Sequence, residues 1–156
     1  MKSASIHVLQ KELHELEPKQ VLELCMRLAK YKKENKELLS YLIFEAHNEK
    51  AYINGIKEEM DILFSEINKS TNYLAKKSLR KILRLTNKFI KYSGSKQTEI
   101  ELKIYFCTKL KTSRIPINTS VVLSNLYNRE IEKIKNAIAK LHEDLQYDYK
   151  QELEKL

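Results

Sequence analysis

Apolar residues recur at spacings of three and four along almost the whole chain, which is the period of an amphipathic helix. Within 97–111, the residues from Glu99 to Ile104 alternate between apolar and polar, which is typical of a strand. The same stretch also carries a helical stripe, and we predict a helix there because no partner strand is visible elsewhere. The pattern therefore predicts an all-α protein.

Gly, Pro and short polar runs divide this pattern into about eight helical segments. Pro18 suits the first turn of one helix, and Gly94 suits the C-terminal cap of another. Neither residue type occurs from Asn118 to Leu156, where we predict a break near 125–128 rather than one continuous helix, because helices of that length are uncommon. The remaining predicted helices cover about 4–16, 18–31, 36–46, 49–67, 72–92 and 97–111.

The segments pair as antiparallel hairpins with a period of about 40 residues, which is the architecture of a HEAT-like α-solenoid. The pairs show no residue-level similarity to one another, and an irregular helical bundle would satisfy the same pattern. At 156 residues the chain is long enough to bury a core, so we expect a single helical domain over 1–156. The expected pairs are 4–32, 34–68, 70–112 and 117–156.

Composition supports long helices with few breaks, because the chain has only two Gly and two Pro, and a β-rich fold would need many more turns. Cys25 and Cys107 lie in apolar helical stretches without paired spacing, so we expect reduced core thiols. The N-terminal residues lack the apolar region of a signal peptide, and no apolar run approaches the ~20 residues of a membrane span. The sequence therefore predicts a cytoplasmic protein with no membrane association.

The positive charge of the chain is concentrated in its middle third. The net charge of the whole chain is +8, yet residues 68–128 alone hold 13 Lys or Arg against two acids, Glu99 and Glu101. Lys outnumbers Arg 24 to 5, a bias that explains part of the basicity but not the absence of acids from one region. A localised excess of this kind favours an acidic partner.

The predicted helix over 72–92 separates this charge from its apolar residues. On a helical wheel with Lys76 at zero, seven cations fall between about 0° and 140°, and the apolar residues fall between about 160° and 340°. Tyr73 lies at about 60°, on the same side as the cations. Several of the cations are spaced i,i+4, where like charges repel and destabilise a helix. The seven cations are Lys76, Lys77, Arg80, Lys81, Arg84, Lys88 and Lys91.

Three interpretations of this basic face follow from the sequence. In the first interpretation, the basic face binds DNA or RNA through the phosphate backbone, with Tyr73 placed to stack on a base. Alternatively, it docks an acidic protein surface, either of a partner or of this chain, where 58–61 and 143–144 are acidic. The third interpretation is a solvated surface without a partner. Sequence-specific reading of bases is disfavoured, because only five Arg occur and no basic recognition helix follows a tight turn.

No motif in the sequence indicates catalysis or a cofactor. With Gly55 and Gly94 alone the chain cannot form a Gly-rich phosphate loop, and GxSxG, HExxH and CxxC are absent. The four His residues show no metal-ligand spacing. We therefore predict a non-enzymatic binding module without a metal or cofactor. Its leading function is binding of nucleic-acid phosphates without sequence specificity, and the alternative is a protein-interaction scaffold or a homodimer.

Overall fold

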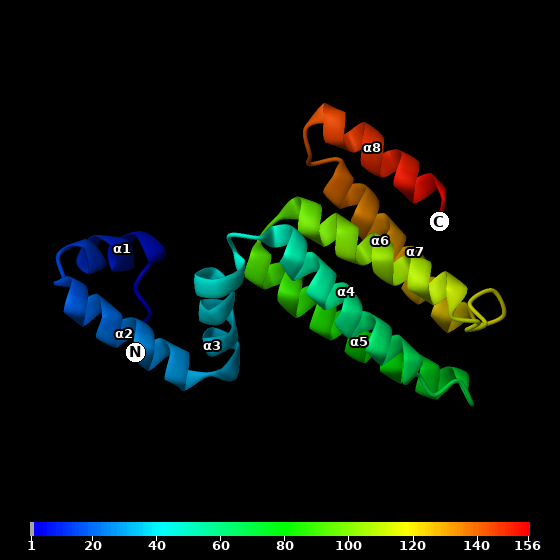
Figure 1. Ribbon diagram of the computed structural model, residues 1–156, viewed down its shortest axis with the longest axis horizontal. Helices are drawn as coiled ribbons and strands as arrows, with labels where there is room; N and C mark the ends of the chain where they lie inside the picture. The colour runs from blue at the N-terminus through cyan, green and yellow to red at the C-terminus, as the bar shows by residue number, and fades with distance from the viewer. Residues whose placement is uncertain (1) are drawn as a thin grey trace. The chain divides into compact units, whose positions relative to one another are not determined.

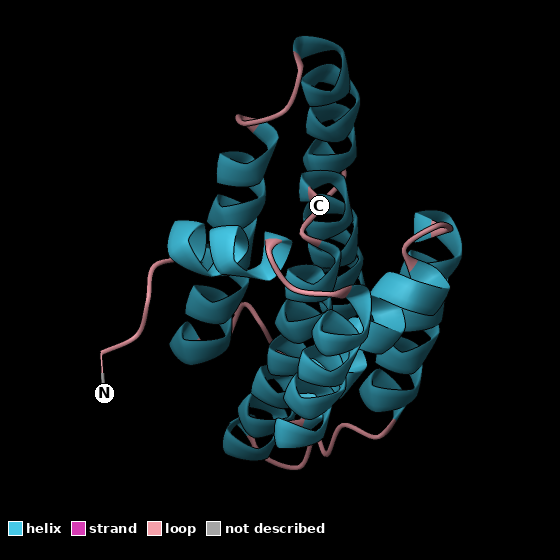
Figure 2. Cartoon of the chain, turned by 90° about the vertical axis from the view of Figure 1, so that its left-hand side faces the viewer, coloured by secondary structure: helices cyan, strands magenta, loops and turns pink. Residues whose placement is uncertain are grey.

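The computed structural model describes residues 2–156, which form helices joined by loops (Figure 2). Eight α-helices and one short π-helical segment are present in this part of the chain, and none of its residues forms a strand. The all-α prediction is confirmed. The ambiguous stretch at 97–111 lies within a helix, as predicted.

The chain consists of two compact units, Met1–Phe44 and Glu45–Leu156. The organisation of 1–156 as a single domain stays a prediction. The first unit holds α1 (Ile6–His14), α2 (Pro18–Tyr31) and α3 (Lys33–Ser40), and the π-helical segment η1 (Tyr41–Glu45) follows α3. The second unit holds α4 (Glu49–Ser65), α5 (Asn72–Ser93), α6 (Lys96–Thr112), α7 (Val121–Ile138) and α8 (Glu143–Glu154) (Figure 1).

Local chemistry accounts for several of these boundaries. Pro18 opens α2, where its missing N–H costs no hydrogen bond. The side chain of Asn48 accepts a hydrogen bond from the Ala51 N–H at 3.1 Å and so caps α4. The predicted connection at 32–35 is shorter in the structure, because only Lys32 leaves the helical conformation before α3 begins. Gly55 lies inside α4 without breaking it.

Helix α6 is the centre of the second unit. It contacts α4, α5, α7 and α8, and α4 and α5 also contact each other. Most of its apolar side chains are fully buried, which is why the run of alternating residues near Ile100 is compatible with a helix that is covered on several sides. The fully buried core includes Met60, Leu79, Ile100, Leu102, Phe106, Leu110, Leu123 and Ile134.

The prediction of two helices over 118–156 is confirmed, but its position for the break, near 125–128, is wrong. Helix α7 runs without interruption through Asn125 and Asn128, and the chain turns later, at 139–142. Asn in a helix costs only a fraction of a kcal/mol, whereas burial of Leu123 and Ile134 on either side stabilises the continuous helix. The later turn lets α8 contact both α6 and α7.

The two cysteines differ, which corrects the expectation that both are core thiols. Cys107 is fully buried in α6, whereas Cys25 is exposed on α2. Burial, followed by the nearby Glu130 carboxylate, raises the pKa of the Cys107 thiol to about 12. Cys25 follows the apolar stripe of α2, but no residue of α2 is buried.

No helix within residues 2–156 has both the length and the apolar character that crossing a bilayer requires.

Candidate functional site

Helix α5 is capped at both ends, and its C-terminal cap is Gly94, as the sequence predicts. The Thr71 hydroxyl accepts a hydrogen bond from the Leu74 N–H at 3.2 Å, which satisfies one of the free N–H groups of the first turn. At the other end Gly94 adopts a left-handed conformation with φ of 68°, and its N–H donates to the Ile90 carbonyl at 2.9 Å. The caps hold a helix of 22 residues, about 33 Å long.

The buried side of α5 lies opposite its cations. Ala75, Leu79, Ile82 and Thr86 are its buried residues, and they fall between about 240° and 300° on the wheel that places Lys76 at zero. Thr86 satisfies its hydroxyl locally by donating to the Ile82 carbonyl at 3.0 Å. Contacts with α4 and α6 cover this side. The cations therefore project away from the core of the second unit.

We call the seven predicted cations of α5 together with Tyr73 the basic face. Lys77, Arg80, Lys81, Arg84 and Lys91 are exposed, and Lys76 and Lys88 are half-buried. Tyr73 is 73% exposed and lies one turn before the first exposed cation. The structure thus brings together on one surface all eight residues that the sequence singled out.

Most of the basic face lacks an acidic partner. Among residues 2–156, no carboxylate lies within ion-pair distance of six of its seven cations. The seventh cation, Lys88, interacts with other side chains of this part of the chain. Lysines elsewhere in the same unit behave differently: Lys109 lies 2.8 Å from Asp61, and Lys103 lies 2.7 Å from Glu99. The six are Lys76, Lys77, Arg80, Lys81, Arg84 and Lys91.

The two acidic stretches that could have covered the face do not pair with it among the described residues. Asp61 is engaged by Lys109 and accepts a hydrogen bond from the Tyr105 hydroxyl at 2.7 Å. These hydrogen bonds outweigh desolvation and lower the pKa of Asp61. Glu143 and Asp144 are exposed in the first turn of α8, where Asp144 lies 3.4 Å from His142. The positive charge of α5 is not neutralised by either stretch.

Lys88 is held against aromatic rings. Its ammonium lies 5.0 Å from the ring centre of Phe89 and 6.0 Å from that of Tyr92, within the range of cation–π attraction. The two rings also pack edge to face at 6.2 Å. Tyr92 is therefore committed to packing at the end of α5, and Tyr73 is the aromatic side chain of the basic face that is open to a ligand.

Sequence reasoning from the α5 wheel missed two cations beside the N-terminal end of this helix. Lys69, in the loop before α5, donates a hydrogen bond to the Ser113 carbonyl at 2.7 Å. This contact brings the loop next to Arg114, which is exposed and has a positive φ of 58°. Both residues belong to the acid-poor middle segment, so the charge pattern contained the signal, but only the fold shows that the two loops meet.

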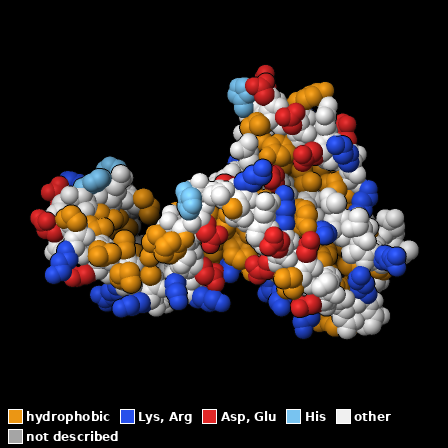
Figure 3. Space-filling model, viewed as in Figure 1, with side chains coloured by type: hydrophobic (Ala, Val, Ile, Leu, Met, Phe, Trp, Pro, Cys, Tyr) orange, Lys and Arg blue, Asp and Glu red, His pale blue; other side chains and the backbone are white. Residues whose placement is uncertain are grey.

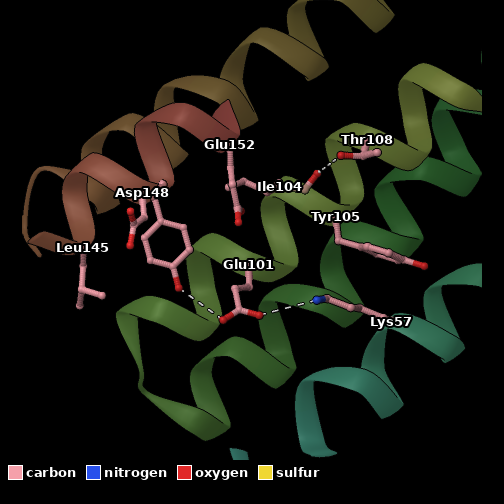
Figure 4. A pocket seen from close by; sticks show the side chains of 9 residues that line it. Lys57, Glu101, Ile104, Tyr105, Thr108, Leu145, Asp148 and Glu152 are labelled. Atoms are coloured by element: carbon pink, nitrogen blue, oxygen red, sulfur yellow. Dashed lines mark hydrogen bonds and ion pairs between the residues drawn. The ribbon is translucent and has the colours of Figure 1, made fainter. Parts of the chain in front are cut away.

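A concave region of about 400 Å³ lies between α4, α6 and α8 in the same unit (Figure 4). Glu101 occupies its centre, where it lies 3.6 Å from Lys57 and accepts a hydrogen bond from the Tyr149 hydroxyl at 3.3 Å. Burial and the Glu101 carboxylate raise the pKa of Tyr149 to about 12. These groups satisfy one another and attach α8 to α6, while Asp148 and Glu152 make the opening acidic.

Comparison with known proteins gives no family to which the chain can be assigned: no family model matches the sequence, and no curated protein or solved structure is significantly similar to it. No group of three or more His, Cys, Asp or Glu side chains within residues 2–156 is arranged to hold a metal ion. The candidate site is therefore argued from the basic face itself.

Proposed function

We propose that the basic face of α5 binds the phosphate backbone of nucleic acid without sequence specificity. The observation that carries this proposal is the set of six cations that have no acidic partner within residues 2–156, on the side of α5 opposite its buried residues. A phosphate is the ligand that this arrangement recognises, because a Lys or Arg that neutralises a phosphate releases a condensed counterion.

The dimensions of the face suit one strand of a nucleic acid. From Lys76 to Lys91 the helix rises about 22 Å, a length that covers roughly six phosphates of one strand of duplex DNA. Successive cations such as Arg80 and Arg84 lie one turn apart and share a side of the helix. Exposed Tyr73, at the start of the face, adds a ring on which an unpaired base could stack.

The chemistry of the side chains supports recognition of the backbone more than of base edges. Five of the seven cations are Lys, which acts as a point charge, and only Arg80 and Arg84 could make bidentate contacts. An acidic protein surface would meet the same unpaired cations, and it is the alternative that the sequence leaves open. A charged surface without a partner is the outcome if neither ligand binds.

The test is fluorescence anisotropy with labelled single- and double-stranded DNA and RNA over a range of salt concentrations. With six phosphate contacts, log affinity should fall against log salt with a slope of about −5 on duplex DNA. Replacing both Arg80→Gln and Arg84→Gln should reduce the slope by about 2, since each lost contact removes about 0.9 of an ion. Gln keeps the helix propensity of Arg, so α5 should stay folded.

A matched control removes the same charge from elsewhere. Arg129 and Lys140 are exposed and have no ion-pair partner among the described residues, and neither belongs to α5. The pair Arg129→Gln and Lys140→Gln should leave the slope unchanged. Equal losses in both double variants would mean attraction to the net charge alone, and absence of binding at low salt would end the proposal. Binding of polyglutamate but not of nucleic acid, lost on reversal of Arg80 and Arg84, would favour the acidic-protein alternative.

A further inference from the structure

The first compact unit has an apolar surface that its own helices do not cover. None of the residues of α1, α2 or α3 is buried, although each helix has the apolar stripe of a core helix. Figure 3 shows these apolar side chains, in orange, spread over this part of the chain. A unit of 44 residues is near the lower limit at which a single core can stabilise a fold. Burial of this apolar surface against another surface would therefore stabilise the unit.

Some of the uncovered side chains line two grooves that flank α2. On one side of α2 lies a groove of about 730 Å³, lined by Leu9 and Leu13 of α1 and by Leu24, Leu28 and Tyr31 of α2. On the other side of α2 a groove of about 310 Å³ continues the surface towards α3. Leu28 lines both grooves, which makes it the centre of the surface.

The apolar area of the two grooves approaches what a stable dimer requires. Six large apolar residues that line them are between 41% and 75% exposed. At on the order of 200 Å² for a fully exposed large side chain, they expose roughly 650 Å². A specific protein interface buries about 800 Å² on each partner, and part of that area is polar. The six residues are Leu9, Leu13, Leu24, Leu28, Tyr31 and Leu42.

The charges around the surface are self-complementary. Arg27 and Lys30 border the larger groove. Glu12 of α1 and Glu15, the C-cap of α1, are exposed, and none of the four has an ion-pair partner among residues 2–156. In a symmetric dimer the same patch is present twice, so the bases of one copy can meet the acids of the other. The unit has eight Lys or Arg and six Glu, so it shows no preference for a strongly charged partner.

We propose that the surface formed by α1 and α2 pairs with the same surface of a second copy of this chain. The interface is symmetric, with Leu28 near its centre and the charged residues of α1 and α2 at its rim. Burial of the apolar residues that line the two grooves supplies the core that the first unit lacks alone. The basic face of α5 has no part in this contact, so the pairing is independent of the proposed binding of nucleic acid.

The test is the molecular mass of the full chain, measured by light scattering and by sedimentation equilibrium from submicromolar to high micromolar concentration. A dimer has a mass of about 37 kDa, twice the 18.5 kDa of the chain. Leu28→Glu should raise the dissociation constant at least about 100-fold and return the mass to that of one chain, because a carboxylate would be buried at the interface. Leu28 is not buried within the unit, and Glu favours helix, so the variant should stay folded.

Ile62→Glu is the matched control. Ile62 lies on α4 in the other unit and is 60% exposed, against 61% for Leu28, so the two substitutions place the same charge at equally exposed apolar positions. The control should keep the mass of the dimer. A mass of one chain at every concentration of the wild type would overturn the proposal, and a Leu28→Glu variant that stays dimeric would overturn the assignment of the interface.

Alkylation of Cys25 gives a second measurement that needs no variant at this surface. Cys25 lines the smaller groove, so dimer formation should protect it, and its rate of reaction should rise as the wild-type protein is diluted through the dissociation constant. Cys107 is buried in the other unit and serves as the internal reference. A rate that does not change with concentration would overturn the proposal. Slow alkylation at all concentrations, with the mass of one chain, would mean that another part of the same chain covers the surface.

Discussion

Reversing one charge at the centre of the basic face should stabilise the protein while it weakens ligand binding. Arg80 is exposed in the middle of α5, with Lys76 and Arg84 at i−4 and i+4 and Lys77 at i−3. None of these four cations has an acidic partner among residues 2–156. Arg80→Glu therefore converts three repulsions into attractions and leaves the helix propensity nearly unchanged.

The magnitude follows from the values for exposed helical pairs. Each i,i+4 pair is worth about 0.2–0.5 kcal/mol, with the sign set by the charges. The two i,i+4 pairs, without the i−3 pair, should therefore raise the free energy of unfolding by about 1 kcal/mol when they change sign. For a unit of this size the melting temperature should rise by about 4 °C. The gain should shrink in 1 M salt, where the Debye length falls to about 3 Å.

The assay is thermal unfolding by circular dichroism at low and high salt, beside the anisotropy measurement with nucleic acid. Lys135→Glu makes the same change of charge at an exposed residue that lies 2.8 Å from Glu132, so it should lower the melting temperature. A lower or unchanged melting temperature for Arg80→Glu would refute the reasoning, because it would mean that acids already neutralise the basic face. Higher stability with weaker binding is the signature of charges that are retained for a ligand.

Three further predictions follow from the second unit. Lys103 is nearly buried and donates to Glu99 at 2.7 Å, so Lys103→Ala should lower the free energy of unfolding by about 3 kcal/mol in urea titrations at neutral pH. Burial opposes ionisation of Glu99, but hydrogen bonds from Lys103 and Lys96 prevail and lower its pKa. The stability that this ion pair contributes is therefore present above the ordinary pKa of 4.5 and is lost as the pH falls through the folded pKa. The difference in free energy of unfolding between wild type and Lys103→Ala should narrow in acid. Gly94→Ala should lower the free energy of unfolding by about 1 kcal/mol because φ is 68° there. Gly55→Ala, inside α4 with open space around it, should raise the free energy of unfolding by about as much. Shifts of the melting temperature in the same direction for both variants would contradict this. With Ellman's reagent at pH 8, Cys25 of a dilute sample should react at once and Cys107 only after unfolding. The reason is that burial, and then the Glu130 carboxylate, raise the pKa of the Cys107 thiol to about 12. Rapid reaction of both thiols in the folded protein would contradict this prediction.

The local features of α5 were predictable because they depend on residues close together in the sequence. Thr71 and Gly94 cap the helix where the sequence placed its ends, and the angular separation of cations and apolar residues follows from the helical period alone. The buried positions Leu79 and Ile82 lie at the centre of the predicted apolar side. The composition of the basic face could therefore be predicted, whereas its lack of partners could not.

The errors arose where a distant contact decides the outcome. Asn125 and Asn128 resemble a break locally, but burial of neighbouring α7 residues stabilises a continuous helix. Cys25 has the periodic environment of a core residue, yet the first unit has nothing to cover it. Amphipathic periodicity shows which side of a helix is apolar, and it contains no information on what, if anything, packs against that side.

The sequence by itself determined the helical class, most of the helix boundaries and the cationic side of α5, because caps, breaks and the period of 3.6 act over a few residues. The tertiary structure decided which charges find partners: Asp61 pairs with Lys109 and Glu99 with Lys103, while the cations of α5 remain unpaired among the described residues. It also decided which apolar stripes are buried, since α6 is enclosed by four helices and α2 is not. Burial and ion pairing depend on residues far apart in the chain, and only the fold brings those together.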